Sequence, residues 1–359
     1  MLSLARCSML WLSMSKVSAG RVQKLLTKYG DFETIFKQLL KNEKLGNNFK
    51  QLHSLHNIKI LNEYYQKFLD NNIKFLFYDD ENYPYLLKNI DSPPYLLYYA
   101  GRLDSLLLPK VGIVGTRNPS SYGQEVSTII ARDLVKNGVC IVSGLAYGVD
   151  AAAHRSALEH NGYTIGVLGS GINVPYPASH RNLLRDIAKN KGLILSEYPP
   201  DTSPAAYHFP HRNRIISGLS LGIVFVEGKI KSGGMITVNE ALKQGREVFA
   251  IPGRIGATMS EGTNTILREG AILATSANDI LQELGLMNLE EDNKTTQELL
   301  KDNLSKQIVQ LLSKEPLFVH EISTVLKINE EILLEKLPIL EIQGFIHREN
   351  DNRYTSSIN

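Results

Sequence analysis

Residues 208–237 read HFPHRNRIISGLSLGIVFVEGKIKSGGMIT, and this stretch indicates the fold. It holds a basic cluster at 210–214, an apolar run at 221–226 and a glycine turn at 232–234. The apolar run has the composition of a buried strand. A glycine turn that opens a helix offers backbone N–H groups and a helix N-terminus to an anion. Because the basic cluster and the turn flank one strand, the stretch predicts a phosphate-binding pocket.

The pattern continues on both sides of this stretch. Apolar runs at 111–114, 139–142, 164–168, 193–195, 223–226 and 248–251 alternate with helical patterns. Short apolar strands that alternate with helices are typical of a parallel sheet covered on both faces. The sequence therefore predicts an α/β fold, preceded by one further strand at 73–78 in a connecting segment.

Glycine-rich turns follow one predicted strand after another. They lie at 115–118, 143–150, 169–171, 232–234 and 252–254. Parallel sheets bind ligands outside the carboxyl ends of their strands, and glycine lets the backbone approach a ligand closely. With Arg117, His154, Arg212 and Arg214 added, these turns favour a polyanionic ligand.

The first 70 residues predict a small helical domain. The first thirty residues carry basic residues and no acidic one before Asp31, which is a feature of transit peptides. Apolar residues at 22, 25 and 26 recur at helical spacing, and Gly30 follows them as a stop signal. We therefore prefer an ordinary helical start, and expect Asp31 to cap the next helix.

The C-terminal part predicts a linker at 288–303 and a second module at 304–359. Three helical patterns and a hairpin in this module indicate a winged helix. Residues 302–359 contain 6 Lys and Arg against 9 Asp and Glu. Because contacts to phosphates supply much of the affinity for DNA, this negative module favours a structural or protein-contact role over DNA recognition.

Composition excludes several classes of protein. The 359 residues have a formal net charge of +2, so any basic surface must be local, and residues 110–270 hold 17 Lys and Arg against 12 Asp and Glu. The two cysteines are far apart, which argues against a disulfide framework. No GxxxxGK[ST] run and no complete dinucleotide fingerprint occurs, which disfavours P-loop ATPases and NAD binding. No apolar run reaches the ~20 residues of a membrane helix.

Several ordered motifs resemble the DNA-processing protein A family, also called Smf. They are VGTR at 114–117, SGLA at 143–146 with GVD at 148–150 and His154, GSG at 169–171 with Tyr176 and Pro177, FPHRNRIISGLS at 209–220, and VFAIPG at 248–253 with SEGTN at 260–264. The resemblance covers about residues 83–281.

The resemblance implies an extended Rossmann-like domain at 71–287 between a SAM-like helical domain at 1–70 and a winged helix at 304–359. It implies a cytoplasmic homodimer, joined through the Rossmann-like domain, that binds single-stranded DNA. Such proteins protect incoming DNA in natural transformation and load the RecA recombinase onto it. The resemblance implies no catalytic residue, no cofactor and no metal, and no association with a membrane.

The resemblance also places DNA contacts. Arg117, Arg212 and Arg214 would contact phosphates, while Ser143, Gly144, Gly169, Gly171 and Gly233 would offer hydroxyl or backbone donors. The site would further include Phe209, His211, Asn213, Ser232, Gly234 and Thr237. Aromatic side chains stack on bases in single-strand binders, and Phe209 is the candidate here.

Each of these assignments has a structural alternative. Arg214 can form an internal salt bridge, and Phe209 can belong to the core. His154, on an alanine-rich helix, is interpreted as the partner of a buried polar group rather than as a functional residue. Asp150 is interpreted as a helix cap.

Two positions depart from the family pattern. His211 stands where the family often carries Lys or Arg, so phosphate binding there would be weaker or more dependent on pH. Residues 232–240, SGGMITVNE, approach the PGGxGTxxE motif of Lonely Guy-type enzymes. The alternative function is therefore a nucleotide 5′-monophosphate phosphoribohydrolase, in which Glu240 would stabilise an oxocarbenium-like centre.

Overall fold

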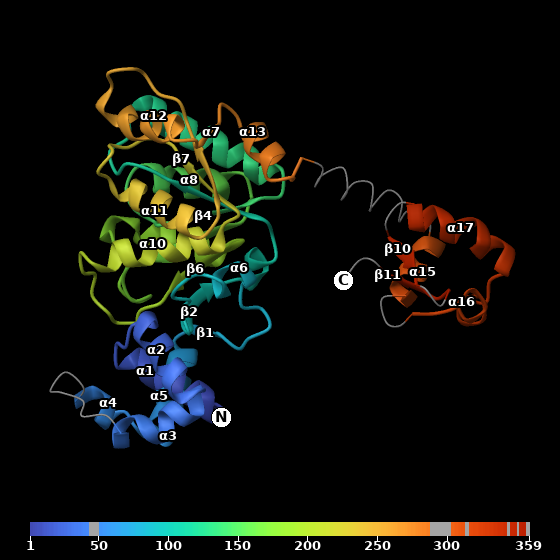
Figure 1. The fold of residues 1–359 in the computed structure, drawn as a ribbon, viewed down its shortest axis with the longest axis horizontal. Coiled ribbons are helices and arrows are strands. Elements are labelled where there is room, and N and C mark those ends of the chain that lie inside the picture. The colour runs from blue at the N-terminus through green and yellow to red at the C-terminus, as the bar shows by residue number, and fades with distance from the viewer. Residues whose placement is uncertain (43–49, 288–302, 313–315, 343–344, 350–351, 357–359) are drawn as a thin grey trace. The chain divides into compact units, whose positions relative to one another are not determined.

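The computed structural model describes residues 1–42, 50–287, 303–312, 316–342, 345–349 and 352–356 (Figure 1). The chain forms two compact units, Met1–Met287 and Asn288–Asn359. Among the described residues, no helix is both long enough and apolar enough to cross a membrane.

The first unit is built on a sheet that has nine strands within the described residues. The strands are β1 Lys74–Phe77, β2 Leu96–Gly101, β3 Lys110–Val114, β4 Cys140–Ser143, β5 Thr164–Leu168, β6 Gly192–Ser196, β7 Gly222–Phe225, β8 Glu247–Ala250 and β9 Ile272–Leu273. Their order is β1-β2-β6-β5-β4-β3-β7-β8-β9. All neighbours from β6 to β9 are parallel, and the pairs β1-β2 and β2-β6 are antiparallel. The predicted α/β class is confirmed.

Two strands, β2 and β9, were not predicted from the sequence. β2 lies in a segment interpreted as a connection, because prolines precede and follow it. β9 is only two residues long and pairs with β8 at the edge of the sheet, and the short apolar run at 271–274 was not interpreted as a strand.

The strand order contains a topological switch point. The chain adds β4, β5 and β6 in turn on one side of β3, and then returns to place β7 on the other side. The connections that leave β3 and β7 therefore diverge, which opens a crevice at the carboxyl ends of these strands. This crevice is where an open α/β sheet is expected to bind its ligand.

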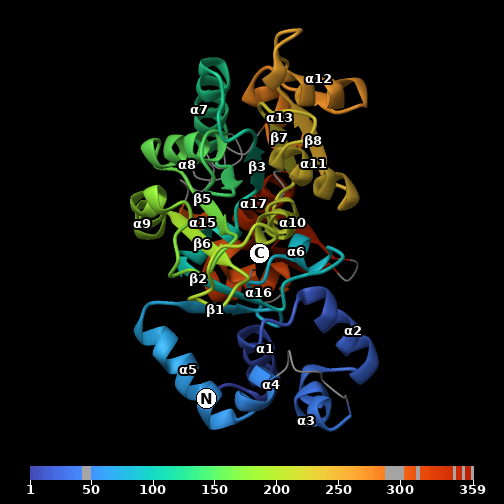
Figure 2. The same ribbon diagram turned by 90° about the vertical axis from the view of Figure 1, so that its left-hand side faces the viewer.

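Helices cover both faces of the sheet (Figure 2). Side chains of the central strands alternate between two cores, one on each face. One core joins the sheet to α7 Ser121–Lys136, α8 Val149–Glu159 and α13 Ala277–Glu283. The other joins it to α6 Tyr85–Lys88, α10 His208–Leu219, α11 Gly233–Lys243 and α12 Glu261–Arg268. A smaller cluster holds α9 Arg181–Lys189 against α8 and the neighbouring strands.

A helical bundle packs against the β1-β2 end of the sheet. Its helices are α1 Leu4–Met14, α2 Ala19–Tyr29, α3 Phe32–Asn42, α4 Lys50–Ser54 and α5 Ile58–Asp70. The buried Trp11 shares one core with Phe77 and Tyr98 of the sheet. The predicted helical start is confirmed, since Gly30 ends α2 at a φ of 88° and Asp31 accepts a hydrogen bond from Thr34 N at 2.7 Å.

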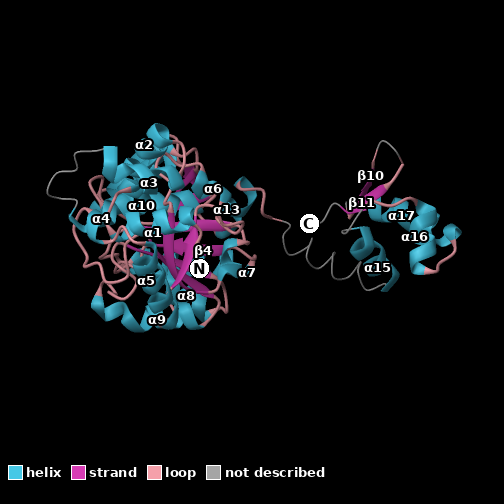
Figure 3. Ribbon diagram, turned by 90° about the horizontal axis from the view of Figure 1, so that it is seen from below, coloured by secondary structure: helices cyan, strands magenta, loops and turns pink. Residues whose placement is uncertain are grey.

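The second unit contains three helices and a two-stranded hairpin among its described residues (Figure 3). They are α15 Asn303–Leu312, α16 Val319–Leu326, α17 Glu330–Ile342, β10 Ile346–Arg348 and β11 Tyr354–Ser356. These are the elements that the sequence predicted, and the winged-helix assignment stays a prediction. The predicted linker lies outside the described residues, apart from its last position.

The bundle is joined to the sheet by a buried hydrogen bond between Ser13 Oγ and Tyr98 Oη, 2.9 Å apart. We predict that Tyr98→Phe lowers the free energy of unfolding by ~1 kcal/mol, because the buried Ser13 hydroxyl loses its partner. Urea denaturation measures this loss. The double variant Ser13→Ala/Tyr98→Phe should lose less than the sum of the two single variants, and strict additivity would contradict the prediction.

Candidate nucleic-acid interface

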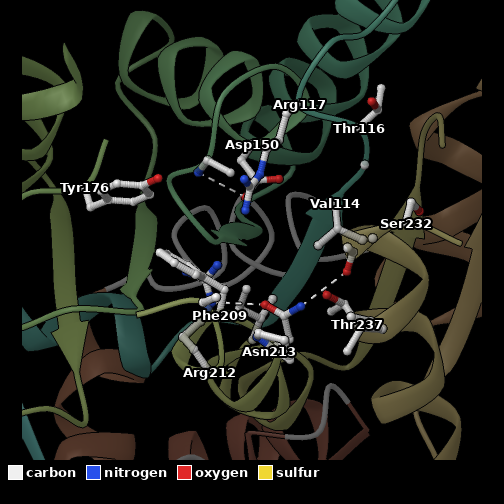
Figure 4. A pocket seen from close by; sticks show the side chains of 18 of the residues that line it. Val114, Thr116, Arg117, Asp150, Tyr176, Phe209, Arg212, Asn213, Ser232 and Thr237 are labelled. Atoms are coloured by element: carbon white, nitrogen blue, oxygen red, sulfur yellow. Dashed lines mark hydrogen bonds between the residues drawn. The ribbon is translucent and has the colours of Figure 1, made fainter. Parts of the chain in front are cut away.

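A cavity of about 600 Å³ opens at the switch point, between the carboxyl ends of β3 and β7 (Figure 4). Five segments line it, and they meet only in the folded chain. The lining comprises Val114, Gly115, Thr116, Arg117, Ala146, Asp150, Tyr176, Pro204, Ala205, Ala206, Phe209, Pro210, Arg212, Asn213, Ile216, Ser232, Gly233, Gly234, Ile236 and Thr237. The basic part and the glycine part of the stretch 208–237 therefore line one cavity, as predicted.

Glu227 fastens the loops that follow β3 and β7 to each other. Its backbone carbonyl accepts a hydrogen bond from Thr116 N at 2.7 Å. Its carboxylate, in a residue only 4% exposed, accepts from Ser120 N at 2.9 Å and from Ser120 Oγ at 2.6 Å. The wall of the cavity that carries Arg117 is thus held in place before any ligand arrives.

The N-terminus of α11 forms the opposite wall. Ser232 caps this helix by accepting a hydrogen bond from Met235 N at 3.4 Å. A side chain at Gly234 would meet Phe225 at 2.6 Å, so only glycine lets the helix begin this close to β7. Gly233 has open space beside it. The first N–H groups of a helix lack partners inside it, and here they lie at the cavity, where an anion is favoured.

Arg212 is buried at the floor of the cavity, with only 5% of the residue exposed. Its Nη1 donates to the backbone oxygens of Gly144, at 2.7 Å, and of Val167, and its Nε donates to Asn213 at 3.1 Å. Burial lowers the pKa of Arg212 to about 10, against the opposing charge of Asp150, so the side chain stays protonated at neutral pH. Arg212 thus joins α10 to the ends of β4 and β5.

Asp150 is not the helix cap that the sequence predicted. Gly148 occupies the cap position of α8, at a φ of 73° that favours glycine. The Asp150 carboxylate accepts hydrogen bonds from Gly144 N at 3.1 Å and Ala146 N at 3.3 Å. Burial raises its pKa, and the charge of Arg212 opposes the rise. Asp150 therefore shapes the turn after β4 and balances the buried guanidinium.

The rim of the cavity combines a cation with two aromatic rings. Arg117 is exposed, and its guanidinium lies 5.8 Å from the centroid of the Phe209 ring. The rings of Phe209 and Tyr176 are 5.2 Å apart and tilted by 41°. Tyr176 belongs to one of the family motifs but is not among the predicted site residues, although it follows the glycine turn after β5. A cation beside partly exposed rings suits a chain of phosphates and flat bases.

The structure divides the fourteen predicted site residues into two groups. Those that line the cavity are Arg117, Phe209, Arg212, Asn213, Ser232, Gly233, Gly234 and Thr237. Those that do not line it are Ser143, Gly144, Gly169, Gly171, His211 and Arg214. Ser143 is buried and donates to Ile113 O at 2.6 Å. Gly169 packs against Phe209, and Gly171 packs against the backbone at 199–200, so these residues support the walls instead.

Arg214 and His211 lie on another side of α10. Arg214 Nη2 forms an ion pair with Glu197 Oε1, and His211 Nδ1 lies 3.4 Å from Glu197 Oε2. Burial acts to raise the pKa of Glu197, but the charge of Arg214 and the contact with His211 outweigh it, and the pKa is lowered. The internal salt bridge that the sequence left open for Arg214 is formed, and the assignment of Arg214 as a phosphate contact stays a prediction.

His154 and Glu240 both lie outside the cavity lining. His154 is fully buried, with Nδ1 2.7 Å from Thr164 Oγ1, and burial lowers its pKa to about 3, so the ring is neutral. Its structural interpretation is confirmed. Glu240 pairs with Lys243 at 2.8 Å on the surface of α11. Within the described part of the chain, no cluster of His, Cys, Asp and Glu is arranged to hold a metal ion.

Comparisons with known proteins identify a family. The model of the family described as DNA recombination-mediator protein A matches residues 74–285. The DNA processing protein DprA of Bacillus subtilis is 44% identical over 213 residues, which are 58% of this chain and 71% of that protein. DprA of Streptococcus pneumoniae is 46% identical over 204 residues, 57% of this chain and 72% of the relative.

Two solved structures are also similar. The X-ray structure of DNA processing protein A from Streptococcus pneumoniae aligns with a TM-score of 0.68 and 35% identity, over 79% of this chain and 98% of that one. DNA processing protein A from Helicobacter pylori, whose structure is described for its single-stranded DNA binding mode, aligns with a TM-score of 0.54 and 34% identity. That alignment covers 59% of this chain and 95% of the Helicobacter chain.

The ion pair between Arg214 and Glu197 generates a prediction about stability. Arg214→Met leaves a buried carboxylate without its main partner and should lower the free energy of unfolding by ~3 kcal/mol. Chemical denaturation followed by circular dichroism measures the change. The matched variant Arg214→Met/Glu197→Leu removes both charges and should recover most of the loss. An Arg214→Met variant as stable as the parent would show that the pair contributes nothing.

Proposed function

Because this chain belongs to the DNA recombination-mediator protein A family, we propose that its switch-point cavity binds single-stranded DNA. The observation that carries the proposal is the joining of Arg117, two aromatic rings and the N-terminus of α11 in one cavity. Phosphates would meet Arg117 and the N–H groups of the α11 turn. Bases would stack on Phe209 and Tyr176.

The kind of contact favours a single strand over a duplex. Stacking on Phe209 and Tyr176 needs an unpaired base, because the faces of bases inside a duplex are already covered by their neighbours. Contacts through phosphates and ring faces carry little sequence information. Binding would therefore tolerate many sequences, as suits a protein that handles DNA of any origin.

We further propose that the bound strand is incoming DNA in natural transformation, which the protein protects and onto which it loads the RecA recombinase as a cytoplasmic homodimer. The relatives are DNA processing proteins and the family is that of a recombination mediator, which supports a role in DNA processing. Loading of RecA and formation of a homodimer are properties that the family resemblance implies. Co-purification with RecA and analytical ultracentrifugation test these two parts.

The position of Glu240 argues against the alternative, a phosphoribohydrolase. Its carboxylate would have to reach the sugar of a nucleotide held by the glycine turn. The structure instead pairs it with Lys243, and it does not line the cavity. Release of a base from a nucleoside monophosphate, lost in Glu240→Ala, would restore the enzyme alternative.

Arg117→Ala should weaken binding of a single-stranded oligonucleotide about tenfold at low salt, because one charge-assisted phosphate contact of ~1.4 kcal/mol disappears. The slope of log affinity against log salt should also become shallower by about 0.7. Fluorescence anisotropy across a salt series measures both. Arg185→Ala, at an exposed arginine on α9 outside the cavity, is the matched control and should change neither. Equal effects of the two variants would overturn the assignment.

A further inference from the structure

We infer that the helical bundle at 1–70 carries a second part of the DNA site, which receives the strand after it leaves the cavity. In this path the strand crosses Tyr207, passes a second cavity and runs along the basic face of α2. The inference rests on the proposed function, because it extends the same ligand. It gives the N-terminal helices a role that neither the motifs nor the comparisons assign to them.

The second cavity, of about 420 Å³, lies on the other side of the N-terminal half of α10. Phe209 and Arg212 line the first cavity, whereas His208 and His211 line the second. The loop before α10 separates the two cavities, since residues 204–206 line the first and Tyr207 lines the second. A flexible strand that leaves the first cavity over this loop therefore enters the second.

Tyr207 stands on this ridge with 74% of the residue exposed. Its ring and that of His208 meet in a T-shaped contact, with centroids 4.5 Å apart. An exposed ring between two cavities is placed to stack on a base.

The second cavity suits a base more than a bare phosphate. Its walls carry Tyr95 and Tyr198, and the ring of Tyr198 is stacked on His208 with centroids 4.0 Å apart. The carboxylate at its side, Glu197, is balanced by its ion pair with Arg214. The aromatic walls are therefore not accompanied by an unbalanced negative charge that would repel DNA.

Cations continue the path beyond the second cavity. Lys16 and Ser18 lie at that cavity, and Ser18 also lines a groove along α2 with Arg21, Lys24 and Lys28. These three cations recur at a spacing of three and four residues, which places them on one face of the helix. The first thirty residues contain five Lys and Arg and no Asp or Glu, so α2 presents a positive surface toward the strand.

Lys16 joins the second cavity to the basic helix. It is exposed and lines that cavity. It follows the cap of α1 at a φ of 57°, in the left-handed region that glycine adopts without strain. The position therefore accepts glycine, which would remove the cation without disturbing the backbone.

The test compares two lengths of single-stranded DNA by fluorescence anisotropy, about 6 and about 30 nucleotides, on the full chain. The short oligonucleotide fills the first cavity only. Lys24→Glu/Lys28→Glu should weaken binding of the long one about fivefold and reduce its salt dependence, with the short one unchanged within twofold. Tyr207→Ala should weaken binding of the long oligonucleotide alone. Tyr207→Phe, which keeps the ring, should bind the long oligonucleotide as the parent does.

Lys16→Gly separates binding from folding. It should raise the melting temperature, because the left-handed backbone is relieved, and still weaken binding of the long oligonucleotide. Lys41→Glu/Lys59→Glu, at two exposed positions of α3 and α5 in the same bundle, is matched in charge and should leave both oligonucleotides unaffected.

Each remaining outcome overturns the inference. If Lys24→Glu/Lys28→Glu binds both oligonucleotides as the parent does, or weakens binding of both equally, the strand does not follow α2. If the two control lysines act as strongly as those of α2, only bulk charge matters. A parent protein that binds neither oligonucleotide refutes the proposed function itself, whereas a parent that binds both through Arg117 but ignores α2 refutes this inference alone.

Discussion

The cavity depends on one buried guanidinium. Arg212 donates to the carbonyls of Gly144 and Val167 at the ends of β4 and β5 and lies beside Asp150, which in turn holds the turn after β4. Its neighbour Asn213 reaches Gly233 O at 3.3 Å and so joins α10 to α11. Strand ends that carry unpaired carbonyls in a buried place would be costly, and a single protonated side chain satisfies them. Because these contacts exist without a ligand, a bound strand would not have to order the site.

The short helix α10 explains why three neighbouring basic residues have three different environments. A turn of 3.6 residues points Arg212 to the cavity floor and turns His211 and Arg214 toward Glu197. The sequence shows only a basic cluster at 210–214. Its division into a cavity face and an ion-pair face depends on the rotation of the helix over the sheet, which the packing of Ile215, Ile216 and Leu219 in the core determines.

Local patterns are predictable from the sequence, whereas features that depend on tertiary packing are not. Apolar runs and glycine turns predicted the parallel sheet, the helical start and the meeting of Arg212 with the turn at 232–234, because these follow from local patterns and from one rule about strand ends. The assignment of Asp150 was wrong, since its partners are backbone groups of a turn whose shape the sequence does not show. The pairing of Arg214 with Glu197 stayed open because it joins residues 17 positions apart across a loop. β9 is too short for any periodicity to reveal.

The extent of burial also determines how strongly salt screens the charge of each cation. Arg212 is only 5% exposed, so salt screens its charge less than the charge of an exposed cation. Arg117 at the rim and the lysines of α2 are exposed, and ions of the solution compete with DNA at each of them. Adding salt would therefore release a strand from the outside inward, first from the helical bundle, then from the rim, and last from the cavity floor. A site built this way would hold one segment of a bound strand longest and would let the flanking strand exchange.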